Sequence, residues 1–146
     1  MRDMLNNKQV VHLGNLTIDG TNAVASAWVD TKGFDACTIM VVNNTVTAAG
    51  TAGFTSTVQH SDSTAASSAA AIVAADSVDG TITVSTTDND DDNIVAGGVG
   101  YKGSKRYVRV AAVGTANSDA DISIVAVMNK PHRAATTFVG TSVAAT

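Results

Sequence analysis

Glutamate is absent from this sequence, and cysteine, proline and aromatic residues are scarce. The single cysteine, Cys37, cannot form a disulfide within the chain, and its setting in ACTIMVV predicts a buried thiol that packs as a small hydrophobic residue. No stretch approaches the roughly 20 apolar residues of a membrane-spanning helix. The opening residues MRDMLNNK lack the apolar segment of a secretory signal. We therefore expect no membrane partner.

Positive charge is scarce as well, because nine lysine and arginine residues stand against 13 aspartates and leave a net charge of −4. A general nucleic-acid binder needs an excess of cations to displace the counterions of the phosphate backbone. One basic cluster, from Lys102 to Arg109, does not reverse this balance. We expect no nucleic-acid partner.

The residue types that carry catalysis are not arranged for it. His12, His60 and His132 lie far apart, and none has the HxH or HxxxH spacing of zinc ligands. No serine lies in a G-x-S-x-G motif. The aspartates cluster at predicted turns, where their side chains bond to their own backbone. We expect no catalytic residue, no cofactor and no enzyme activity.

The densest charge lies in DNDDDN, residues 88–93. An EF-hand loop requires glycine at its sixth position and glutamate at its twelfth, but Asn93 and Val99 occupy those positions here. We interpret the run as a solvated loop, since like charges repel one another. The alternative is an irregular calcium site, because carboxylates of one loop can converge on a hard cation. Its ligands would be Asp88, Asp90, Asp91 and Asp92.

A glycine motif, G-x-G-x-x-G, occupies residues 98–103. A phosphate-binding loop of this kind needs a helix to open from the glycines. The residues that follow instead alternate, with Val108 and Val110 set against Tyr107 and Arg109, which predicts a strand. We interpret the glycines as a tight connection that needs positive φ and leads into a central strand.

Alternation of apolar and polar residues predicts strands throughout the chain. The predicted strands are residues 9–18, 22–31, 35–44, 52–61, 80–88, 105–114 and 120–129. Serine and threonine faces opposite valine and isoleucine faces are typical of antiparallel sheets. Because the apolar share is mostly alanine and valine, we expect a thin core such as the space between two packed sheets. The most apolar strand, 35–44, is predicted to lie inside a sheet.

Other segments depart from this pattern. Residues 63–77 are rich in alanine and predict either a short helix or a loop lying on the sandwich. Pro131 is predicted to end the last strand. The chain is thus divided into an N-terminal arm (1–9), a β-sandwich domain (10–131) and a C-terminal tail (132–146).

Four stretches together resemble a family of small tailed-bacteriophage virion proteins, some of which are capsid decoration, or cement, proteins. They are WVDTKGFDACTIMVV (28–42), TSTVQHSDS (55–63), GYKGSKRYVRVAAV (100–113) and DISIVAVMNKPH (121–132). The resemblance implies a jelly-roll-like sandwich, commonly trimeric, made in the host cytoplasm and seated on the capsid exterior. It implies the major capsid protein and further copies of the chain as partners, with no enzyme activity and no cofactor.

The residues Lys105, Arg106, Tyr107 and Arg109 are the predicted interface under this interpretation. Tyrosine and arginine are enriched at interfaces, and Arg109 can pair with a carboxylate or stack on an aromatic ring. The other interpretation is a solvated strand face. A different function, a carbohydrate-binding or adhesive β-sandwich of a tail or surface structure, requires exposed aromatic platforms. The sole tryptophan, Trp28, lies mid-strand among alanines and is predicted to be in the core.

Metal removal tests the interpretation of the acidic run. We predict that EDTA leaves the melting temperature unchanged within a few degrees, because the aspartates lack an ordered ligand spacing. Thermal unfolding followed by fluorescence, with and without EDTA, measures this. A larger fall in melting temperature, restored by added calcium, would instead support the site at residues 88–92.

Overall fold

The computed structural model describes residues 8–48, 53–78, 82–85 and 95–131, and this part of the chain is built from strands. The only helical elements in it are two 3-10 turns, Ala66–Ser68 and Ala74–Asp76. The prediction of an all-β fold is confirmed. The strands are β1 (Lys8–Asp19), β2 (Ala23–Ala25), β3 (Val29–Asp30), β4 (Phe34–Ala48), β5 (Gly53–Ser61), β6 (Ala70–Ala71), β7 (Ile82–Ser85), β8 (Val95–Tyr101), β9 (Tyr107–Gly114) and β10 (Ser118–Pro131).

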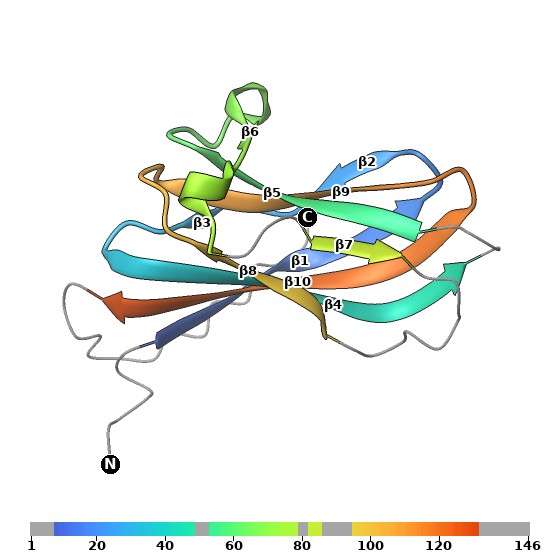
Figure 1. Cartoon of the computed structure of the whole chain (residues 1–146), viewed down its shortest axis with the longest axis horizontal. Coiled ribbons are helices and arrows are strands. Elements are labelled where there is room, and N and C mark those ends of the chain that lie inside the picture. Colours follow the sequence, from blue (N-terminus) through green and yellow to red (C-terminus); the bar gives the residue numbers. More distant parts are fainter. Residues whose placement is uncertain (1–7, 49–52, 79–81, 86–94, 132–146) are drawn as a thin grey trace, which may run out of the picture.

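The strands form two antiparallel sheets that pack as two layers (Figure 1). Sheet A has the order β1-β10-β4-β8; sheet B has the order β2-β9-β5-β6, with β3 also paired to β9 and β7 to β5. If β2 with β3 and β6 with β7 are each taken as one interrupted strand, the first strand pairs with the last and successive pairs nest inside that pair. This is the strand order of a double-sheet jelly roll, so the predicted jelly-roll-like sandwich is confirmed.

The core lies between the two sheets and follows the alternation of the strands. On β9, Val108 and Val110 are fully buried, and both β4 and β9 lie inside their sheets as predicted. The core is less alanine-rich than the composition suggested, because its largest fully buried side chains are isoleucines and valines. They are Ile18, Ile39, Ile122, Ile124, Val41, Val58, Val99, Val108 and Val110.

The glycine motif forms only part of the predicted turn, because Gly103 alone lies in the connection between β8 and β9. Gly98 and Gly100 lie within β8, opposite Met40 and Thr38 of β4. Positive φ occurs in the described residues at Gly14, Gly20 and Gly33, and not in this motif. The reason for glycine at position 100 is close packing, since a Cβ there would come within 3.1 Å of the Val78 side chain.

The alanine-rich segment forms neither an α-helix nor a simple loop. Residues 62–78, which we call the strap, leave sheet B after β5, pass through both 3-10 turns and add the short β6 to the edge of β5. Neither turn has a side-chain cap. The helix propensity of alanine alone does not stabilise an α-helix as short as this segment would form. The strap then bonds to the end of β8, where the Val78 N–H donates to the Gly100 carbonyl at 2.8 Å.

The element boundaries depart from the predictions in several places. β1 begins at Lys8, inside the predicted N-terminal arm, and β4 and β10 are longer than the predicted strands 35–44 and 120–129. β7 is the described part of the predicted strand 80–88. The predicted strand 22–31 is split into β2 and β3, because the Ser26 hydroxyl accepts the Val110 N–H at 3.0 Å and replaces a ladder contact. The candidate calcium ligands, the tail 132–146 and most of the arm lie outside the described residues.

Replacing Val110 with alanine tests the sandwich core. We expect V110A to lower the free energy of unfolding by about 2 kcal/mol, because it removes fully buried methyl groups and leaves a cavity. Val113, on the same strand, is 41% exposed, so V113A is the matched control and should change the free energy by less than about 0.5 kcal/mol. Urea unfolding measures both, and equal losses would contradict this packing.

Candidate interaction surface

The alternation of β9 places two of the predicted interface residues on the outer face of sheet B. Val108 and Val110 point into the core and are fully buried. Tyr107 and Arg109 therefore point outward, and both are half-buried by their neighbours on the sheet. The predicted division of this strand into a core face and an outer face is correct.

Arg109 is held over the one tryptophan of the chain. Its Cζ lies 4.5 Å from the centroid of the Trp28 ring, and its Nε–H donates to Gln59 Oε1 at 2.9 Å. Of the two partners predicted for Arg109, the structure uses the aromatic ring. Trp28 is half-buried, so the prediction that it belongs to the core is wrong. The break between β2 and β3 turns Ser26 inward and leaves the indole beside the outer face of β9.

Arg106 makes the second pairing of this surface. Its guanidinium spans the carboxylate of Asp30, with Nε 3.0 Å from Oδ1 and Nη2 2.5 Å from Oδ2, and its Cζ lies 4.9 Å from the centroid of the Tyr107 ring. The hydrogen bond from Arg106 lowers the pKa of Asp30, helped by the Lys32 N–H and opposed by partial burial. Asp30 thus holds the guanidinium of Arg106 beside the Tyr107 ring.

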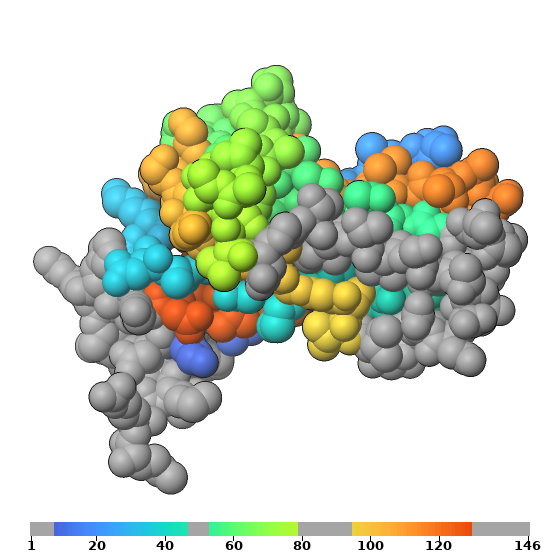
Figure 2. Space-filling model, in the orientation of Figure 1, coloured from blue at the N-terminus to red at the C-terminus, as the bar shows by residue number. Residues whose placement is uncertain are grey.

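Lys105 connects this region to the strap. Its Nζ lies 2.5 Å from Asp62 Oδ2, and this pairing lowers the pKa of Asp62. Figure 2 shows the yellow-green strap and the orange connection between β8 and β9 side by side at one end of the molecule. The four predicted interface residues thus lie together, and each has a partner within the chain. Sequence reasoning missed the partners Trp28, Asp30 and Gln59, because each comes from a different strand or connection.

A polar pocket lies beside the strap. It encloses about 340 Å³ and is lined by His60, Ser61, Asp62, Ser63, Ser68, Ala70 and Lys105. His60 Nδ1 lies 3.2 Å from the Tyr101 hydroxyl and 3.8 Å from Asp76 Oδ2. Burial raises the pKa of Tyr101, and its hydroxyl also bonds to the backbone of Lys105. These contacts tie β5, the strap and the end of β8 together, which is a structural role.

Neither the cysteine nor the metal-binding residue types form a reactive site in the described ranges. Cys37 is 2% exposed, and burial raises the pKa of its thiol to about 12, so the prediction of a buried cysteine is confirmed. Within residues 8–48, 53–78, 82–85 and 95–131, no three histidine, cysteine or acidic side chains gather closely enough to hold a metal ion. No helix in these ranges is long and apolar enough to cross a membrane.

Fold and surface together define a jelly-roll sandwich whose sheet B presents tryptophan, tyrosine and arginine outward. No family model and no curated protein matches the sequence. Among solved structures, the exported protein XepA of PBSX has a similar fold, with a TM-score of 0.56 and 12% identity over 100% of this chain and 45% of XepA. This chain therefore spans less than half the length of XepA.

A second solved structure is a Bacillus endospore appendage protein, from a family described as disulfide-linked pili. It has a TM-score of 0.42 and 14% identity, over 90% of this chain and 96% of its own. The likeness to XepA concerns the fold alone, and the likeness to the appendage protein supports no conclusion about this chain.

The pairing of Asp30 with Arg106 predicts a pH dependence. Because the folded-state pKa of Asp30 lies below its ordinary value of 3.8, the pair stabilises the fold above that pH, and the contribution is lost as the pH falls through the folded-state pKa. We expect R106Q to raise the pKa of Asp30 and K105Q, the matched control, to raise that of Asp62 instead. Carboxyl-carbon NMR titration measures both, and an unmoved Asp30 pKa in R106Q would contradict the pairing.

Proposed function

We propose that this chain is a non-enzymatic structural protein of a phage virion, which decorates and stabilises the capsid as a homotrimer bound to the major capsid protein. The observation that carries the proposal is the cluster of Trp28, Arg106, Tyr107 and Arg109 on the outer face of sheet B, which we call the aromatic–arginine surface. Tryptophan, tyrosine and arginine are the residue types that dominate the binding energy of protein interfaces.

The geometry of the aromatic–arginine surface suits a binding role. Gln59 and Asp30 hold the two guanidinium groups in place, so binding costs little additional side-chain entropy. In the described part of the chain, the guanidinium of Arg109 uses its Nε–H alone. The remaining N–H donors are available to carbonyl or carboxylate groups of a partner. The cationic charge of Arg106 is balanced by Asp30, which favours a shape-specific partner over a general polyanion.

The fold is compatible with a place in a virion shell. Jelly rolls build viral capsid proteins as well as lectins, and the phage protein XepA shares the sandwich architecture. A cyclic trimer matches the three-fold positions of a capsid lattice, and three equivalent contacts raise the strength of attachment through effective concentration. A sugar-binding role fits the surface less well, because Arg109 covers one face of the Trp28 ring on which a sugar would stack.

Binding to capsids tests the proposal. Light scattering should give a trimer, and the purified protein should co-sediment with phage capsids that lack it. We expect R109A to weaken this binding by about 30-fold, the effect of losing one hot-spot residue of about 2 kcal/mol. R109K keeps the charge but loses the planar donor group, and should also weaken binding.

Lys102 provides the matched control, because it is an exposed cation in the neighbouring connection between β8 and β9. K102A should bind capsids as the unaltered protein does. A monomer that ignores capsids but is retained on a polysaccharide column would refute the proposal and favour the adhesive alternative.

A further inference from the structure

Arg109 carries a positive charge that the described part of the chain leaves unbalanced. The other arginine of the aromatic–arginine surface, Arg106, spans the carboxylate of Asp30. Arg109 has a neutral partner instead, because its Nε–H donates to the Gln59 side chain. The surface therefore presents one cation for which no described residue supplies an anion.

The chemistry of the guanidinium determines how the Gln59 amide is turned. A guanidinium has donors only, so the amide oxygen must face Arg109, and Oε1 does so at 2.9 Å from Nε. Among the residues that the structure describes, the amide NH2 group of Gln59 has no acceptor. Its neighbour across the strand pair on β6 is Ala71, whose methyl group cannot accept a hydrogen bond. Gln59 therefore adds N–H donors beside those of Arg109.

The two Nη groups are the open end of Arg109. Nε is occupied by Gln59, and Cζ lies over the Trp28 ring at 4.5 Å from its centroid. The Nη groups have no acceptor in the described ranges, and their N–H donors lie in the plane of the guanidinium. Parallel donors of this kind match the two oxygens of a carboxylate, which they bind through two hydrogen bonds.

Small, uncharged residues lie next along the two strands. Thr57 of β5 is paired with Ala111 of β9, two positions from Gln59 and Arg109. Side chains two positions apart on a strand share a face, so Thr57 and Ala111 lie on the outer face of sheet B as well. Neither has a long side chain that could fold over the guanidinium, so a group from another molecule has room to reach it.

We propose that Arg109 and Gln59 form a binding site for the carboxylate of an aspartate or glutamate side chain of the partner protein. The site offers donors only, and a carboxylate is an acceptor only. One carboxylate supplies the single negative charge that Arg109 lacks, whereas a phosphate group with a charge of about −1.5 to −2 would stay partly unbalanced. The inference rests on the proposed binding role of this surface and names the group that it recognises.

Binding of sodium acetate to the full chain tests the site without any capsid. The chain has one tryptophan, so the ring beneath the guanidinium gives a single indole N–H resonance in NMR. We expect acetate to shift this resonance and the Arg109 Nε–H resonance in a saturable manner. Acetamide, which has a similar shape and no charge, should not do so, and neither should sodium chloride at equal ionic strength. Acetate without a saturable shift would overturn the proposal.

The Q59E variant separates a carboxylate site from a general effect of charge. Its introduced carboxylate has the shape of the amide and pairs with Arg109 within the chain, so the affinity for acetate should fall by at least about tenfold. K102Q lowers the net charge by the same single unit at an exposed residue and should bind acetate as the unaltered chain does. The Val110 N–H, which donates to Ser26 in the core, should keep its resonance in both variants. Equal affinities in Q59E and K102Q would overturn the proposal.

Capsid binding by the same two variants distinguishes this inference from the capsid function. Q59E should co-sediment with capsids at least about tenfold more weakly than K102Q. Equal binding of both variants would overturn the carboxylate site and leave the capsid function in place. A chain that binds acetate as expected but ignores capsids would refute the capsid function and support the site. Tighter binding of glucuronate than of acetate would overturn the assignment to a protein side chain in favour of an acidic sugar.

Discussion

The packing of two sheets around one shared core is the constraint on which the rest of the structure depends. Side chains alternate with a period of two, so burying one set of residues on a strand exposes the other set. Burial of Val108 and Val110 on β9 puts Tyr107 and Arg109 outside. Both outer surfaces of the molecule are thus consequences of a single requirement, the exclusion of water from the space between the sheets.

The connections between strands then determine what these outer faces present. The link between β8 and β9 is short and basic, and two of its cations, Lys105 and Arg106, pair with Asp62 in the strap and Asp30 in β3. Exposed ion pairs of this kind add little stability because water screens them. Their effect is on position. The Asp30 pair holds Arg106 beside Tyr107, and the Lys105–Asp62 pair holds the strap against the sandwich. A partner of this surface meets rigid rings and planar groups in place of mobile cations.

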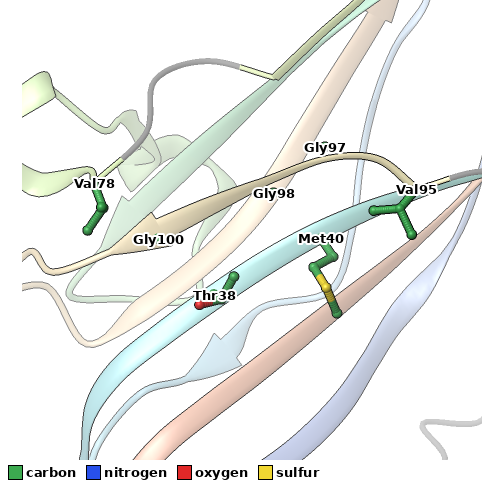
Figure 3. A pocket seen from close by; sticks show the side chains of 7 residues that line it. All are labelled: Thr38, Met40, Val78, Val95, Gly97, Gly98 and Gly100. Carbon is green, nitrogen blue, oxygen red and sulfur yellow. The ribbon is translucent and has the colours of Figure 1, made fainter.

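The packing of the strap on the glycine-rich part of β8 also affects the neighbouring surface. The strap lies close to β8, so that a Cβ at position 100 would come within 3.1 Å of the Val78 side chain. Gly97, Gly98 and Gly100 of β8 also line a hollow beside Met40 (Figure 3). The glycine-rich part of β8 therefore lies next to both the strap and this hollow.

The local pattern of residues was enough to predict most strands, the buried cysteine and the outward direction of Tyr107 and Arg109, because alternation is a local property of an extended chain. It failed for residues 22–31, where a serine hydroxyl replaces a ladder contact, and for Gly100, where a Cβ would crowd Val78 of another segment. The partners Trp28, Gln59 and Asp30 could not be predicted either, since no local signal joins residues 50 or more positions apart.

Composition and period alone were enough to predict the class of fold, the absence of an internal disulfide and the acidic balance of the chain. Which strands are neighbours, and hence that Arg109 lies on Trp28 and Arg106 on Asp30, could be known only from the three-dimensional arrangement. Strand pairing is not set locally, because many similar valine-rich and threonine-rich segments compete for the same partners. Its outcome depends on how well the whole set buries its apolar faces together, and no single segment carries that information.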